Sequence, residues 1–285
     1  MKALLTTCLA MLLCTTVQSV AASSLDENLI RNRKLLLISN SASSGEAYLA
    51  WPQKHITAFL SGSGVKELLF IPWAGVNLSD RGLNASFEAY AKKVQKAFAP
   101  LGLNIRSLHR EADPVQAVQK AAAIAVGGGN TFHLLYMLHK TGVIEAVRMK
   151  VAQGTPYIGW SAGANVACPT LRTTNDMPII EPQSFAALNL IPFQINPHYL
   201  DAHPQGHGGE TRQQRIEEFL AVNREIAVVG LREGTALIVE GGRISLVGSR
   251  SMRVFHYGRE PRESQSGENV SSILKADRVL TPPER

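Results

Sequence analysis

Cysteine is scarce in this chain, which has three among 285 residues. Cys8 and Cys14 lie in an apolar segment at the start, and Cys168 stands alone in the remainder. A lone cysteine excludes an intramolecular disulfide, so stability has to come from a hydrophobic core. No run of basic residues is interleaved with aromatics. The net charge of +6 and the pI near 9.3 therefore indicate loose attraction to anionic surfaces, and no nucleic-acid partner is expected.

The first 22 residues have the pattern of a secretory signal peptide. A positive start at Lys2 precedes an apolar run from Ala3 to Val17, and small residues follow at Ala21 and Ala22. The run is short for a bilayer span, which favours cleavage near Ala21 or Ala22 over a membrane anchor or a buried first helix. We expect a periplasmic or secreted protein, free of the membrane after cleavage, that is a monomer or homodimer.

The rest of the chain divides into three segments. Residues 23–33 are polar without a consistent period and predict a linker, whereas the polar, proline-rich residues 259–285 predict a mobile tail. Residues 34–258 carry the folded domain. A composition of 45% hydrophobic and 18% charged residues is typical of a globular domain.

The pattern within 34–258 predicts an α/β fold with a mostly parallel sheet sandwiched by helices. Continuous apolar runs at 35–38 and 68–71 are typical of strands buried on both faces. Further strands are predicted at 103–108, 123–126 and 157–159, and helices at 87–98, 113–121, from 162 onward, and at 211–222. Short antiparallel strands are predicted near the C-terminus, at 226–231, 235–240, 244–247 and 253–257. Residues 168–209 lack periodicity, and long irregular segments of this kind commonly carry function.

Residues 159–163 read Gly-Trp-Ser-Ala-Gly and follow a predicted strand. This Gly-x-Ser-x-Gly pattern, placed between a strand and a helix, predicts a nucleophile elbow with Ser161 exposed at its tip. A structural turn is the alternative, because glycine and serine are common in turns. The helix-compatible residues after Ala162 favour catalysis.

A nucleophilic serine needs a base, and the base needs a third group to hold its tautomer. His198 ends a short strand-like piece in Asn-Pro-His, where a rigid turn would present it, and is the best candidate base. Asp176 is an acid in an otherwise uncharged loop and is the candidate third group, with a turn or capping role as the alternative. The other histidines considered are predicted in helices or at strand ends, where an ordinary buried or exposed histidine suffices, namely His55, His109, His133, His139 and His256.

A second glycine-rich turn, Gly-Gly-Gly-Asn-Thr at 127–131, also joins a predicted strand to a helix. It lacks the lysine and spacing of a P-loop and the glycine pattern of a dinucleotide site. We therefore predict an oxyanion hole built from the N–H groups of Gly129 and Ala162. Asn130, next in the loop, is assigned to substrate binding.

A metal site is the competing interpretation of the histidine-rich segment. The possible ligands are His198, Asp201, His203, His207 and Glu210. His203 and His207 have the spacing of a helical zinc pair, but the intervening Pro204 and Gly206 argue against a helix. We expect no metal and no cofactor.

The chain resembles the peptidase E family, the α-aspartyl dipeptidases, across roughly residues 35–257. The resemblance rests on Leu-Ile-Ser-Asn-Ser at 37–41, Ile-Pro-Trp-Ala-Gly-Val at 71–76, Gly-Gly-Gly-Asn-Thr-Phe at 127–132, Gly-Trp-Ser-Ala-Gly-Ala-Asn at 159–165, Thr-Thr-Asn-Asp-Met-Pro-Ile at 173–179, Gln-Ile-Asn-Pro-His at 194–198 and Gly-Glu-Thr-Arg-x-Gln-Arg at 209–215. It implies a fold related to class I glutamine amidotransferases, with serine in place of their cysteine. It also implies a triad of Ser161, Asp176 and His198 acting through an acyl-enzyme.

The same resemblance implies a small peptide substrate, a dipeptide with a free N-terminal aspartate. An arginine matching Arg212 is associated in the family with holding the aspartyl carboxylate, and a guanidinium suits that task because it binds a carboxylate with two hydrogen bonds. An exposed helix charge paired with Glu210 or Glu217 is the alternative role for Arg212.

Two other functions stay open at this point. A cyanophycinase-like exopeptidase of the same superfamily would cleave β-aspartyl-arginine polymer, and export would suit that substrate. A secreted binding protein could keep the elbow without activity. The chain also departs from the bacterial family members, which are typically cytoplasmic and end near the last strand.

Overall fold

The computed structural model describes residues 29–201, 206 and 208–274. The predicted signal peptide lies outside these residues. Within them, no helix combines the length and apolar character needed to cross a membrane.

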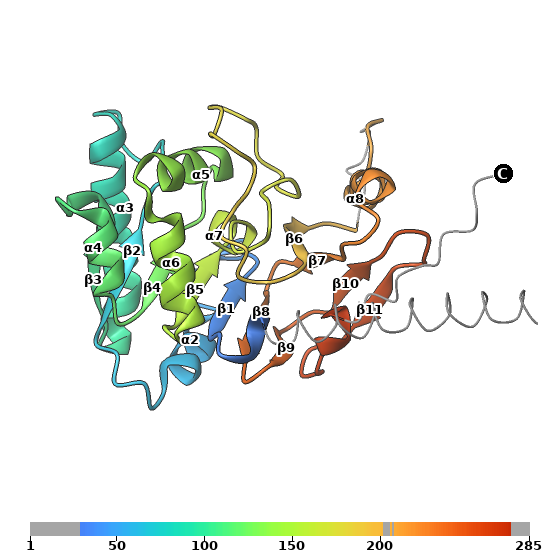
Figure 1. Cartoon of the computed structure of the whole chain (residues 1–285), viewed down its shortest axis with the longest axis horizontal. Coiled ribbons are helices and arrows are strands. Elements are labelled where there is room, and N and C mark those ends of the chain that lie inside the picture. Colours follow the sequence, from blue (N-terminus) through green and yellow to red (C-terminus); the bar gives the residue numbers. More distant parts are fainter. Residues whose placement is uncertain (1–28, 202–205, 207, 275–285) are drawn as a thin grey trace, which may run out of the picture.

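The main sheet has seven strands in the order β3-β2-β4-β5-β1-β8-β9 (Figure 1). The strands are β1 (Leu35–Ile38), β2 (Glu67–Ile71), β3 (Asn104–Ser107), β4 (Ile124–Val126), β5 (Tyr157–Trp160), β8 (Thr235–Glu240) and β9 (Arg243–Gly248). All pairings from β3 to β1 are parallel, whereas β8 runs antiparallel to β1 and β9 antiparallel to β8. The predicted α/β fold with a mostly parallel sheet is confirmed.

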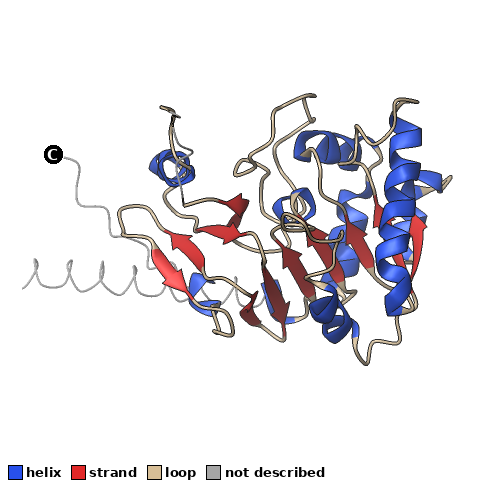
Figure 2. Ribbon diagram, turned by 180° about the vertical axis from the view of Figure 1, so that it is seen from behind, coloured by secondary structure: helices blue, strands red, loops and turns tan. Residues whose placement is uncertain are grey.

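Helices cover both faces of this sheet (Figure 2). They are α2 (Gln53–Leu60), α3 (Leu83–Phe98), α4 (Pro114–Gln119), α5 (Thr131–Lys140), α6 (Val143–Ala152) and α7 (Ala162–Asn165), with short 3-10 helices η1 (Ala99–Leu101) and η2 (Leu108–Arg110). Alternate residues of β1 enter different cores: Leu35 and Leu37 pack with α4 to α7, and Leu36 and Ile38 pack with α2 and α3. The apolar run of β1 is continuous because both of its faces are buried.

A second sheet of four strands lies beside the first, in the order β11-β10-β7-β6. It consists of β6 (Gln194–Tyr199), β7 (Val228–Arg232), β10 (Met252–Phe255) and β11 (Arg262–Ser264), and it packs against α8 (Arg212–Val222). The strands predicted near the C-terminus are present, but they are shared between the two sheets. The segment predicted to be irregular contains β6, which pairs in parallel with β7.

The predicted linker and tail are corrected by the structure. Ile30 is fully buried, and the Arg33 guanidinium donates to the Asn189 carbonyl at 3.0 Å. After residue 258, β11 pairs with β10, and η3 (Ser271–Leu274) follows the buried side chain of Val270. The folded unit therefore extends from before residue 34 to residue 274, because apolar side chains in both segments complete the core; residues 275–285 lie outside the described range.

Candidate active site

Ser161 lies at the sharp turn between β5 and α7, as the sequence predicts. Its backbone has φ 54° and ψ −113°, a conformation that is strained for a residue with a side chain. The turn needs glycine on both sides: a Cβ at Gly159 would collide with the Gly163 carbonyl, and one at Gly163 with the Val126 carbonyl. The geometry is that of a nucleophile elbow.

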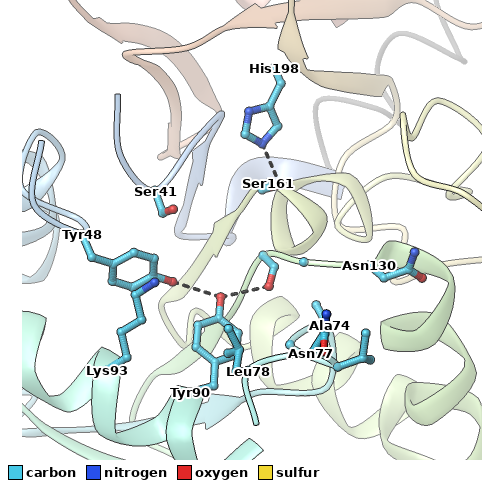
Figure 3. A pocket seen from close by; sticks show the side chains of 14 residues that line it. Ser41, Tyr48, Ala74, Asn77, Leu78, Tyr90, Lys93, Asn130, Ser161 and His198 are labelled. Carbon is cyan, nitrogen blue, oxygen red and sulfur yellow. Dashed lines mark hydrogen bonds between the residues drawn. The ribbon is translucent and has the colours of Figure 1, made fainter. Parts of the chain in front are cut away.

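His198 reaches Ser161 from the second sheet (Figure 3). Its Nε2 atom lies 2.8 Å from the Ser161 Oγ. His198 also has a positive φ, 53°, at a register shift in β6. Buried Ser39, at the end of β1, supports this conformation: its hydroxyl accepts from the His198 N–H at 2.9 Å and donates to the Leu231 carbonyl at 2.7 Å.

The third member of this chain of hydrogen bonds is Glu233. The Nδ1 atom of His198 lies 2.7 Å from Glu233 Oε1, and both side chains are about 39% exposed. Glu233 stands in the tight turn between β7 and β8. Sequence reasoning missed it, although an acid directly before Gly234, between two predicted strands, is a recognisable signal.

The structure does not bring Asp176 to the imidazole, which corrects its assignment as the third group. Its Oδ2 atom accepts from the backbone N–H of Thr131 at 2.7 Å and from the Thr131 hydroxyl at 2.5 Å. This position caps the N-terminus of α5, where backbone donors and the helix dipole favour an anion. Asp176 therefore has the helix-capping role that its local sequence left as the alternative. Its neighbour Asn175 reaches β6 instead, donating to the Pro197 carbonyl at 2.7 Å.

Arg212 is the first residue of α8, after the capping box formed by Thr211 and Gln214. Burial lowers the pKa of its guanidinium and neighbouring Arg215 lowers that pKa further, whereas the charge of Asp176 raises it. Arg212 and Asp176 thus interact electrostatically. The role of Arg212 toward substrate stays a prediction.

Asn130 caps the same α5 terminus as Asp176. Its Oδ1 accepts from the His133 N–H at 3.0 Å, and its Nδ2 donates to the Met177 carbonyl at 2.9 Å. Asn130 also lines the cavity beside Ser161. The structure therefore shows a positioning role for the side chain, and its predicted contact with substrate stays a prediction.

The glycine loop lies against the nucleophile. A Cβ at Gly128 would stand 2.8 Å from the Ser161 Cβ, and one at Gly129, whose φ is +128°, would collide with the Ala74 carbonyl. Among the described residues, neither the Gly129 N–H nor the Ala162 N–H donates a backbone hydrogen bond. Both groups are available for the predicted oxyanion hole.

A cavity of about 350 Å³ opens beside Ser161 and His198. Its wall includes Tyr48, whose ring lies 4.2 Å from the Lys93 ammonium. Across the described part of the chain, no group of three or more His, Cys, Asp and Glu side chains is placed to hold a metal. Of the possible ligands, His203 and His207 lie outside the described residues, and Asp201 pairs with Arg232 at 2.6 Å.

Comparison with known proteins identifies the family of this chain. The chain belongs to peptidase family S51, which it matches over residues 35–247, and it is therefore a peptidase. Within that family it is similar to enzymes named peptidase E: 47% identical to that of Nostoc sp. over 86% of this chain and 98% of the relative, and 46% identical to that of Streptomyces coelicolor over 84% and 94%. The predicted resemblance to peptidase E is confirmed.

Two solved structures share the fold. A peptidase from an acI-B1 Actinobacterium aligns with a TM-score of 0.62 at 19% identity, covering 84% of this chain and 96% of that one. A putative peptidase E protein from Listeria monocytogenes aligns with a TM-score of 0.50 at 23% identity, covering 82% and 98%.

Proposed function

We propose that this chain is a serine exopeptidase that hydrolyses dipeptides with a free N-terminal aspartate, using Ser161, His198 and Glu233 as its triad. The observation that carries the proposal is the continuous chain of hydrogen bonds from Glu233 through His198 to Ser161, at 2.7 and 2.8 Å. Similarity to the peptidase E enzymes supports the choice of substrate.

In the first half of the reaction, His198 Nε2 takes the Ser161 proton as Oγ attacks the peptide carbonyl. The Glu233 carboxylate accepts from Nδ1–H, which sets the tautomer and stabilises the imidazolium. The oxyanion lies against the N–H groups of Gly129 and Ala162. When the C–N bond breaks, His198 returns its proton to the departing amine.

Water completes the cycle. His198 takes a proton from water as the oxygen attacks the aspartyl ester, and it then protonates Ser161 Oγ as the ester bond breaks. The free aspartate leaves, and the enzyme returns to its starting state. These steps need no redox partner or cofactor.

Arg212 supplies the selectivity in this proposal. A guanidinium binds a carboxylate with two parallel hydrogen bonds, and an uncharged side chain in its place would leave it without these bonds. Asp176 lies within electrostatic range of Arg212 and opposes the effect of burial on it. We infer that the charge of Asp176 helps hold the guanidinium in place for the aspartyl side chain.

A dipeptide panel tests the proposal. The expected result is hydrolysis of Asp-Leu and little hydrolysis of Asn-Leu or Ala-Leu, unchanged by chelator and abolished in Ser161→Ala. Arg212→Met is expected to raise KM for Asp-Leu. The ratio of kcat/KM for Asp-Leu to kcat/KM for Asn-Leu should therefore be smaller in this variant than in the wild type.

Other outcomes identify the alternatives. Preferential cleavage of β-Asp-Arg favours the cyanophycinase-like activity, and failure of a fluorophosphonate probe to label Ser161 favours a binding protein. Wild-type rates in Ser161→Ala would disprove the assignment of the nucleophile.

We also propose that the protein is exported to the periplasm or beyond. The support is the sequence pattern of residues 1–22 alone. N-terminal sequencing of the protein from fractionated bacterial cells is expected to begin near residue 22 or 23 in the periplasmic or secreted fraction. An intact N-terminus found in the cytoplasm would contradict it.

A further inference from the structure

Tyr90 donates its hydroxyl proton to the Gly128 carbonyl, with 2.9 Å between the two oxygens. It belongs to α3 and is 4% exposed. We propose that Tyr90 is a positioning residue, which holds the Gly128–Gly129 peptide so that the Gly129 N–H faces the oxyanion. This inference rests on the proposed function, because it assigns a role within the same oxyanion hole.

The Tyr90 hydrogen bond acts on the peptide unit between Gly128 and Gly129. The Gly128 C=O and the Gly129 N–H belong to one peptide, and the described residues contain no cis peptide bond. In a trans peptide these two groups point in opposite directions. A hydrogen bond that fixes the carbonyl therefore fixes the N–H as well. In Figure 3 this hydrogen bond is one of the two dashed lines that meet at the Tyr90 hydroxyl; the other joins Tyr90 to Tyr48.

The Gly128–Gly129 peptide needs an external anchor. Glycine residues flank it, and glycine has the widest range of backbone conformations. Close contact with the tyrosine limits that freedom: a Cβ at Gly127 would lie 2.7 Å from the Tyr90 ring. The ring and hydroxyl of Tyr90 thus contact the loop on one side. Ser161 lies close to Gly128, and Ala74 lies close to Gly129.

The hydrogen bonds around Tyr90 set the direction of its hydroxyl proton. The Tyr48 hydroxyl donates to the Tyr90 oxygen at 3.0 Å. The Trp160 indole N–H, which can act only as a donor, is shared between the Tyr48 oxygen at 2.9 Å and the Tyr90 oxygen at 3.1 Å. With two donors facing its oxygen, Tyr90 directs its own proton to Gly128. Trp160 immediately precedes Ser161, so this network ties the nucleophile's strand to the oxyanion peptide.

The surroundings keep the hydroxyl protonated and in place. Burial raises the pKa of Tyr90 to about 12, so the proton is present at neutral pH. The Tyr90 and Phe70 rings pack at right angles with 5.1 Å between centroids, and Phe70 stacks on Trp160 at 5.8 Å. The anchor is therefore rigid.

The test is Tyr90→Phe, which keeps the ring and removes the hydroxyl. Loss of an oxyanion donor lowers kcat by roughly 10²–10³-fold, and loss of a group that only orients the donor should cost less. We expect kcat for Asp-Leu to fall about 10- to 100-fold, with little change in KM, by comparison with that range. Labelling of Ser161 by a fluorophosphonate should slow by a similar factor, because its phosphoryl oxygen occupies the same hole.

Ser107→Ala is the matched control. Ser107, on the edge strand β3, also has a fully buried hydroxyl, which lies 2.7 Å from the His109 Nδ1, and it contacts neither Gly128 nor the turn of Ser161. A structural effect of losing one buried hydroxyl should lower Tm in both variants. The large fall in labelling rate is expected only in Tyr90→Phe, with circular dichroism confirming that both variants are folded at the assay temperature.

Two results would overturn the positioning role: labelling of Tyr90→Phe at the wild-type rate, or an equal loss of labelling rate in Ser107→Ala. Labelling also separates this inference from the proposed substrate. If the wild type labels at Ser161 but does not cleave Asp-Leu, the substrate assignment fails, and the labelling rates of the two variants still decide the role of Tyr90.

Discussion

His198 and Glu233 are joined by a hydrogen bond of 2.7 Å between Nδ1 and Oε1, although 35 residues separate them in the chain. The parallel pairing of β6 with β7 explains their meeting. Pro197 pairs with Leu231 and Tyr199 with Arg232, so the two strands deliver His198 and the turn after β7 to the same end of the sheet. The base and its acid therefore both come from the second sheet, and the nucleophile from the first.

Glu233→Gln is expected to lower kcat by about 10⁴-fold, the loss found when the acid of a serine triad becomes an amide. The amide cannot stabilise the imidazolium and permits the wrong tautomer. Steady-state kinetics on Asp-Leu measures the effect. Glu240→Gln is the matched control, because Glu240 is an exposed partner of Lys34 at the far end of β8. Near-normal kcat in Glu233→Gln would refute the triad.

Asp176→Ala should destabilise the protein by about 1 kcal/mol or more, the usual effect of losing a helix cap. Both the backbone and the hydroxyl of Thr131 lose their acceptor. Asp113→Ala provides the comparison, because Asp113 caps α4 through one exposed contact with the Gln116 N–H. Chemical denaturation is expected to show the larger loss for Asp176; equal stability of Asp176→Ala and wild type would contradict the capping role.

Ser39→Ala is expected to reduce both stability and kcat. Its hydroxyl bridges the His198 N–H and the Leu231 carbonyl, and an unsatisfied buried polar group costs about 1–3 kcal/mol. Ser107→Ala removes another fully buried serine hydroxyl, at the edge strand β3 and bonded to His109. Thermal melts should show a decrease in both variants, whereas kinetics should show a loss in Ser39→Ala alone. Unchanged kcat in Ser39→Ala would show that His198 holds its conformation without this bridge.

Gly128→Ala should abolish most activity. The new Cβ would stand 2.8 Å from the Ser161 Cβ, so the nucleophile or the loop must move. Displacement of a reacting group by about 1 Å can cost on the order of 10²-fold in rate, and we expect at least that loss in fluorophosphonate labelling. Gly208→Ala, where a Cβ meets nothing within 4 Å, should keep the wild-type Tm. Labelling of Gly128→Ala at the wild-type rate would contradict this prediction, because it would show that the loop accommodates the methyl group without displacing Ser161.

Stability should fall in acid because of Glu263 on β11. Hydrogen bonds from Arg232 lower the pKa of Glu263 from 4.5 to about 2. A depressed pKa in the folded state contributes stability above pH 4.5 that is lost as the pH falls toward 2. In Glu263→Gln the Tm is expected to depend less on pH across that window. If Tm changed with pH as steeply in Glu263→Gln as in the wild type, Glu263 would be excluded as a source of the acid sensitivity.

The sequence by itself determined the local devices of this protein. Alternating apolar runs and helical periods defined the α/β sheet, since a strand buried on both faces is apolar throughout. The glycines around Ser161 marked an elbow because only residues without a Cβ fit that turn. The glycine loop at 127–129 and the candidate base His198 were found in the same way, from signals contained within a few residues.

Only the tertiary structure decided which acid serves His198. Asp176 and Glu233 are both acids in turns, and their local sequence does not reveal which one lies near the imidazole. The loop of Asp176 folds over the N-terminus of α5, where two Thr131 donors hold the carboxylate, whereas strand pairing carries Glu233 to His198. The position of a third group depends on how distant strands pair, and that is a property of the whole fold.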